Sequence, residues 1–265
     1  MLISLLLGVL VGIVLGLTGA GGGILAVPAL VIGLGWTMQQ AAPVALIAVV
    51  VAATIGTIEA FSRRLVRYRA AGLMALCGIP FTLLGVQAAQ QLSQRWLTII
   101  FALVMLLVAA RQLQSGKIAS ADGGDEYPAV PVHMNVATGR IAWTWPTAAI
   151  IAGIGAVTGL LSGLLGVGGG FVIIPALKKW TEVSMQGITA TSLMVIALVG
   201  SGGVVSALLH GVTLPTVLTL LFTAATVVGM LIGRYLIRQL NATQIRNGFA
   251  SLVIVVAVSL LIRVR

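Results

Sequence analysis

Long apolar segments, separated by short polar breaks, follow one another along this chain. In the first half a glycine-interrupted segment is followed by three others, at 2–34, 38–60, 70–90 and 97–114. The second half repeats this order at 146–178, 185–209, 214–237 and 244–262. An α-helix needs about 20 apolar residues to cross the hydrocarbon core of a bilayer. The pattern therefore predicts an all-α polytopic membrane protein.

Composition agrees with a chain that lies in lipid. Hydrophobic residues make up 59% of the 265 positions, charged residues 8% and aromatic residues 5%. Because apolar and polar residues do not alternate, the segments resemble helices rather than strands of a barrel. The net charge of +10 lies in the breaks, where anionic lipid explains it, so nucleic-acid binding is not expected. We expect a multi-pass protein of the cell inner membrane.

Two glycine-rich phrases show that the chain is a duplication. Residues 16–30 read GLTGAGGGILAVPAL, and residues 163–177 read GLLGVGGGFVIIPAL. Every glycine, the proline and the following Ala-Leu match at one offset of 147, which is 163 minus 16. We therefore divide the chain into a first transmembrane repeat, an inter-repeat linker rich in polar residues and a second transmembrane repeat, at 1–114, 115–145 and 146–265.

The glycine-interrupted element has two possible courses, and basic residues discriminate between them. It can cross once, which gives parallel repeats, or turn back at the glycines, which gives inverted repeats. With the arginines between Arg63 and Arg69 in the cytoplasm, parallel repeats place nine of the 15 basic residues inside. Inverted repeats place 12 of the 15 inside and leave Arg95, Arg263 and Arg265 outside. The positive-inside rule favours inversion, with a cytoplasmic linker and both termini outside.

Each glycine phrase predicts a broken helix. Glycine costs about 1 kcal/mol and proline about 3 kcal/mol relative to alanine in a helix, so we expect breaks here, with Pro28 and Pro175 as hinges. Freed backbone groups are tolerated in a membrane where they line a cavity or are buried in protein. A helix that restarts after a break offers N–H groups and partial positive charge to an anion. Two breaks related by pseudo-symmetry predict one midplane site made of two half-sites.

A helix-packing face is the alternative interpretation of one GxxxG sequence, but three consecutive glycines in both copies favour a site. Hydroxyl groups near the breaks can donate to an anion, although they also bond to carbonyl groups of their own helix. The residues that we assign to substrate binding are Thr18, Gly19, Gly21, Gly22, Gly23, Ser162, Gly166, Gly168, Gly169, Gly170, Thr191 and Ser192.

Glu59 is the acidic residue that lies within a predicted span, and Arg63 follows it by one helical turn. An i,i+4 ion pair at the interface is the simpler interpretation of this arrangement. The alternative is a role in ion coupling or at the substrate entrance, because an ionisable group in a span is costly.

The duplicated phrase, the sequence from Ala190 to Leu193 (ATSL) and the two-half layout resemble the sulfite exporter TauE/SafE family, also called TSUP. The resemblance covers nearly the whole chain apart from the linker. It implies a secondary transporter that exports sulfite, sulfonates, sulfoacetate or related small anions. The first half departs from the pattern, because Ala42 to Ala45 (APVA) stands opposite Thr189 to Ser192 (TATS). Hydroxyl groups would therefore come unequally from the two halves.

Two other functions are weighed against anion transport. A cation or metal permease needs intramembrane carboxylate, histidine or cysteine clusters, which the spans lack, so no metal site is expected. An intramembrane serine hydrolase needs Gly-x-Ser-Gly and a histidine base. Leu160 stands where the first glycine would precede Ser162, and no acid is placed to orient a histidine. Neither glycine phrase forms a P-loop, so no nucleotide cofactor is expected. A homodimer is left open.

Overall fold

The computed structural model describes residues 1–19, 21–121, 134–135, 140–141, 144–181, 183–209, 214–237 and 239–263. The first half contains α1 (Leu2–Thr18), the short 3-10 turn η1 (Gly21–Leu25), α2 (Ala26–Leu34), α3 (Met38–Ser62), α4 (Tyr68–Gln91) and α5 (Gln94–Ala121). The second half contains α6 (Trp145–Leu165), α7 (Gly170–Trp180), α8 (Met185–Leu209), α9 (Thr216–Leu236) and α10 (Ala242–Arg263). Between the halves, β1 (Met134–Asn135) pairs antiparallel with β2 (Arg140–Ile141).

Seven helices of the described chain are long and apolar enough to cross a membrane: α3, α4, α5, α6, α8, α9 and α10. Two shorter apolar segments, Leu2–Thr18 and Gly21–Leu34, correspond to the first glycine-interrupted element. The prediction of an all-helical membrane protein is therefore confirmed, with the two-residue β pair as a small addition.

α5 continues to Ala121 and so enters the stretch 115–145 that the sequence assigned to the linker, although its apolar span ends at Gln114. Most of that stretch lies outside the described residues. By contrast, α8 occupies the predicted range of residues 185–209. Helix bounds set by apolar length are thus predicted better than bounds in polar sequence.

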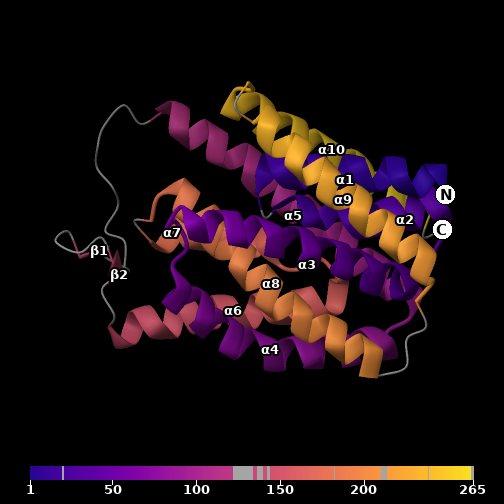
Figure 1. Cartoon of the computed structure of the whole chain (residues 1–265), viewed down its shortest axis with the longest axis horizontal. Helices are drawn as coiled ribbons and strands as arrows, with labels where there is room; N and C mark the ends of the chain where they lie inside the picture. Colours follow the sequence, from indigo (N-terminus) through magenta and orange to yellow (C-terminus); the bar gives the residue numbers. More distant parts are fainter. Residues whose placement is uncertain are drawn as a thin grey trace.

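The two halves pack through reciprocal pairs of helices. α1 packs against α9 and α4 against α6, and these are the two largest contacts between helices; α3 packs against α8, and α5 against α10. Under the sequence offset, α1 corresponds to α6 and α4 to α9, so each half contributes the same pair in exchanged roles. Figure 1 shows α1, α9 and α10 along one side of the molecule, α4 and α6 along the other, and α3 between them.

The equivalent helices α3 and α8 run antiparallel at the centre of the molecule. A Cβ atom added to Gly56 of α3 would lie 3.1 Å from Leu193 Cδ1, whereas one added to Gly203 of α8 would lie 2.9 Å from Leu46 Cδ2. Higher numbers in one helix therefore meet lower numbers in the other. In each of these two helices, half of the most apolar 18-residue segment is buried, compared with 28% in α10. This pair forms the core, and α10 exposes most of its surface to the surroundings.

Glycines allow the cross-half pairs to approach closely and show that these helices are parallel. A Cβ atom on Gly12 of α1 would lie 2.9 Å from Gly229 Cα of α9, and Gly16 and Gly233 repeat the contact one turn further along. On the other side, a Cβ atom on Gly159 of α6 would lie 2.8 Å from Gly78 Cα of α4. Small residues at helix contacts are typical of packing in lipid, where close van der Waals contact replaces the hydrophobic effect.

Candidate functional site

The structure interrupts both helices at the predicted glycines. α1 ends at Thr18, Gly19 has φ +78°, and the chain then forms the 3-10 turn η1 before α2 starts. In the second half Gly166, Gly168 and Gly169 have φ values of +69°, +78° and +68°, and α7 starts at Gly170. Residues with a side chain rarely adopt these left-handed conformations, whereas glycine adopts them readily. The second break is thus built by three glycines in left-handed backbone.

The proline hinges are not where the chain breaks. Pro28 lies in the first turn of α2 and Pro175 lies inside α7. A proline in the first turn is tolerated because the N–H group that it lacks has no partner within the helix there. Both prolines therefore belong to the helices that follow the breaks, and the glycines alone form the interruptions.

The two breaks contact each other near the middle of the central helices. A Cβ atom on Gly23 would lie 2.8 Å from Val167 O, the carbonyl within the second break, and 3.2 Å from Val49 Cγ1. A Cβ atom on Gly168 would lie 3.2 Å from the same Val49 atom and 2.9 Å from Ile196 Cγ2. Val49 and Ile196 are equivalent positions of α3 and α8 under the offset of 147, which is 196 minus 49. Unwound backbone from both halves therefore meets at one level.

The remaining glycines of the breaks pack against flanking helices. Gly19 lies against Thr189 of α8, and its counterpart Gly166 lies against Ala42 of α3, which is the equivalent position. Gly22 approaches the backbone of α1, and a Cβ atom on Gly169 would lie 2.9 Å from Thr158 O of α6. Gly21 has looser surroundings, because the atom nearest to an added Cβ is Thr18 Oγ1 at 3.7 Å.

Two of the four predicted hydroxyl groups are already engaged in hydrogen bonds. Thr18 Oγ1 donates to Val14 O at 2.8 Å, within its own helix. Thr191 Oγ1 donates to Gly187 O at 2.7 Å and accepts the N–H of Arg67 at 3.1 Å. Thr191 thus connects α8 to the residue that precedes α4, which is a structural role.

Ser162 and Ser192 are different, because each hydroxyl is fully buried and has no hydrogen-bond partner within the described chain. Thr158 Oγ1 is also fully buried without a hydrogen-bond partner among the described residues, and sequence reasoning missed it. Its signal in the sequence was its spacing, one helical turn before Ser162. A buried hydroxyl without a partner costs about 1–3 kcal/mol. These three groups are therefore candidates for donating to a ligand.

The hydroxyl groups do not gather at one level. Thr82 of α4 lies against both Gly163, next to Ser162, and Gly203 of α8; a Cβ atom on Gly203 would lie 3.1 Å from Thr82 Cγ2. Gly203 follows Ser192 by 11 residues, which is about 16 Å along a helix. Ser162 and Ser192 thus lie on opposite sides of the level at which the breaks meet. Thr158, beside Gly169, lies close to that level.

Polarity differs between the two halves. The second half supplies Thr158, Ser162, Thr191 and Ser192, whereas the equivalent first-half positions hold Val11, Leu15, Val44 and Ala45. The expected inequality of hydroxyl groups thus extends from α8 to α6.

Glu59 forms the ion pair with Arg63 that the sequence predicted, with 3.0 Å between Oε1 and Nη2. Its other oxygen, Oε2, pairs with Arg234 of α9, which sequence reasoning missed because this partner is 175 residues away. The Arg234 guanidinium lies over Gly56 of α3, and the Arg234 backbone lies against Gly16, close to the first break. One carboxylate thus joins α3 to α9, across the two halves.

Among the described residues, no group of three or more His, Cys, Asp or Glu side chains is placed to hold a metal ion. The polar groups near the breaks are hydroxyl and main-chain groups. The arrangement is that of a polytopic membrane transporter, in which helices broken inside the membrane meet in the interior.

Residues 4–260 match the family model described as Sulfite exporter TauE/SafE, and the chain belongs to this family. It is therefore a membrane transporter and not an enzyme. A Xylella fastidiosa (strain Temecula1) protein named "Probable membrane transporter protein" is 32% identical over 202 residues, which cover 76% of this chain and 70% of that protein.

A more distant relative is the "Probable membrane transporter protein MamO" of Magnetospirillum gryphiswaldense. It is 23% identical over 273 residues, which cover 94% of this chain and 43% of that protein. No solved structure matches the chain.

Proposed function

We propose that this transporter moves a small sulfur-containing or organic anion, such as sulfite, a sulfonate or sulfoacetate, out of the cell across the inner membrane. The observation that carries this proposal is the contact between the two breaks, one from each half, at the middle of α3 and α8. Substrate sites of secondary transporters occur where broken helices meet near the midplane. The family resemblance supplies the sulfur-containing class of substrate.

The second break supports an anion rather than a cation. The first N–H groups of α7 have no partner within the helix, and they carry the positive end of its dipole. Thr158 Oγ1 and Ser162 Oγ are buried without partners on the neighbouring helix α6. All these groups can donate hydrogen bonds, and no carboxylate or histidine of the described residues stands among them. A hard or soft metal cation would find no suitable ligands here.

The proposed topology is a pair of inverted repeats. It is supported by the antiparallel course of α3 and α8, which occupy equivalent positions in the two halves. In addition, α1 begins and α10 ends at the opposite end of the molecule from β1 and β2 (Figure 1). With Arg63 and its neighbours in the cytoplasm, both termini lie outside, and each glycine-interrupted element turns back within the membrane.

In this topology the Glu59 ion pairs lie at the cytoplasmic end. They join α3 to α9 beside the first break, so we propose that they hold the cytoplasmic side closed in this conformation. Opening toward the cytoplasm would separate Glu59 from Arg234 while Arg63 stays with it on the same helix. Loss of one of two partners is suited to alternating access, since the Glu59 carboxylate keeps the other cation, Arg63, throughout.

Transport into liposomes tests the proposal. Uptake of radiolabelled sulfite or sulfoacetate is measured with and without a pH gradient, for the native chain and for Thr158→Val, Ser162→Ala and Ser192→Ala. We expect each variant to lower uptake at least several-fold. Thr226→Val is the matched control, because that hydroxyl is equally buried but donates to Phe222 O of its own helix at 2.7 Å. Loss of uptake in the control alone would refute the anion site. A second refuting result would be a higher unfolding temperature of the purified protein with divalent metals but not with anions.

A further inference from the structure

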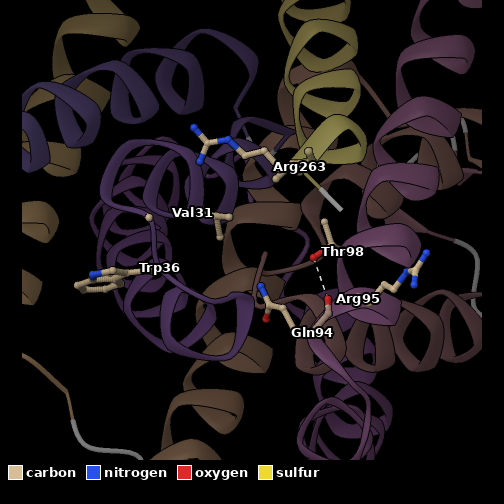
Figure 2. Close-up of a pocket in the computed structure, with 8 residues that line it drawn as sticks. Val31, Trp36, Gln94, Arg95, Thr98 and Arg263 are labelled. Atoms are coloured by element: carbon tan, nitrogen blue, oxygen red, sulfur yellow. Dashed lines mark hydrogen bonds between the residues drawn. The ribbon is translucent and has the colours of Figure 1, made fainter. Parts of the chain in front are cut away.

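A cavity lies apart from the glycine breaks, at one end of the described helices. It has a volume of about 370 Å³ and opens where α2 and α10 end and α5 begins (Figure 2). Val31, Trp36 and Leu260 form its apolar wall, and Gln94, Arg95, Thr98 and Arg263 supply its polar groups. None of these residues belongs to the proposed transport site.

The polar groups of this cavity are donors. Gln94 Oε1 accepts the backbone N–H of Met38 at 2.9 Å, which fixes the amide and leaves its NH₂ group without a partner among the described residues. In Figure 2 the Gln94 side chain extends toward the space between Trp36 and Thr98. Thr98 Oγ1 donates to Gln94 O at 2.9 Å, so its hydrogen is engaged. Two guanidinium groups and one amide NH₂ therefore remain to bind a ligand.

The charge of the cavity is unbalanced. Neither Arg95 nor Arg263 has a salt-bridge partner among the described residues, and the acid that those residues contain, Glu59, is paired at the other end of the molecule. Figure 2 shows the two arginine side chains on opposite sides of the cavity, directed away from each other. An anion in the cavity would accept charge-assisted hydrogen bonds from these guanidinium groups once their flexible side chains turn toward it.

In the proposed inverted topology both arginines also lie at the outer end of the protein, where the positive-inside rule disfavours them. A specific ligand gives a reason for this placement. We infer that the cavity binds an oxyanion, that is, a phosphate or sulfo group carried either by a lipid headgroup or by a small solute. This site is independent of the proposed transport mechanism, because it shares no residue with the breaks.

Gln94→Glu is the most specific variant, because the new carboxylate still accepts the Met38 N–H while a charged oxygen replaces the NH₂ donor. Arg95→Gln combined with Arg263→Gln removes both charges. Arg246→Gln is the matched control, since Arg246 is a half-buried arginine near the start of α10 whose Nε donates to Asn247 Oδ1 at 3.5 Å.

Two measurements on the full-length protein separate the sources of the oxyanion. Calorimetry reports binding of inorganic phosphate and sulfate, and native mass spectrometry reports retention of phosphatidylglycerol against phosphatidylcholine. We expect Gln94→Glu and the double arginine variant to weaken at least one of these interactions tenfold or more, with the control unchanged. Loss in calorimetry identifies a solute, and loss in mass spectrometry identifies a lipid. Equal effects in the control, or no effect in either variant, would overturn the inference, whatever the liposome assay shows for transport.

Discussion

Gly21 and Gly23 lie in the same 3-10 turn, yet a methyl group added to each meets different surroundings. On Gly23 it would lie 2.8 Å from Val167 O and 3.2 Å from Val49 Cγ1, closer than ordinary contact. On Gly21 its nearest neighbours are Thr18 Oγ1 at 3.7 Å and Phe249 Cζ at 3.8 Å, which is ordinary contact. Neither glycine has a positive φ, so the backbone accepts alanine at both positions.

The two substitutions are therefore expected to change stability in opposite directions. Replacing glycine by alanine stabilises by about 0.4–1 kcal/mol where the native backbone accepts it, because the unfolded chain loses freedom. Overpacking of a close contact costs about 1–3 kcal/mol. Gly21→Ala should therefore be neutral or slightly stabilising. Gly23→Ala should destabilise by about 1–2 kcal/mol, because its methyl group pushes the first break away from the second.

Thermal unfolding of the purified variants in one detergent, followed by tryptophan fluorescence, measures the difference. For a chain of this length about 1 kcal/mol corresponds to roughly 2–4 °C in the midpoint. We expect Gly23→Ala to unfold several degrees below Gly21→Ala. Equal midpoints, or a lower midpoint for Gly21→Ala, would show that the two breaks are not in contact.

Three other expectations follow from the contacts described above. Glu59→Gln should change the unfolding midpoint little, because an exposed ion pair contributes about 0–1 kcal/mol, but it should alter the transport rate several-fold. Exchanging the residues at positions 59 and 234 should restore the rate. If the exchanged variant stays impaired, the ion pair does not close the cytoplasmic side. Thr191→Val should lower stability by about 1–3 kcal/mol, measured by thermal unfolding, since the Arg67 N–H loses its acceptor; an unchanged midpoint would contradict this structural role. A reporter fused to the C-terminus should be active outside the cytoplasm, and cytoplasmic activity would refute the inverted topology.

The helices of this protein were largely predictable from local sequence. A long apolar stretch in lipid has few choices, because every backbone N–H and C=O group must be satisfied within the segment. For this reason α8 begins and ends at the predicted residues. The glycine breaks were also predictable, since a run of glycines has a low helix propensity in any surroundings. In contrast, α5 continues beyond its apolar span into polar sequence, where apolar length is no guide to the end of a helix.

The candidate site was predictable only in part. The sequence indicated the glycines, but it assigned all four hydroxyl groups to one substrate site. The structure engages Thr18 and Thr191 in hydrogen bonds and separates Ser162 from Ser192 along the helix axes. Helical spacing shows which residues share a face, but the level at which one helix meets another depends on the register of packing. That register is set by glycine contacts between α4, α6 and α8.

From its amino-acid order alone, this chain specifies the apolar spans, the duplication and the two interruptions, because these depend on residues that are neighbours along the backbone. The contact between the breaks, the partner that Arg234 supplies to Glu59 and the cavity beside Arg95 and Arg263 depend on segments more than one hundred residues apart. Such features exist only once the helices have packed, since close approach of glycine surfaces, and not local propensity, fixes which side chains meet.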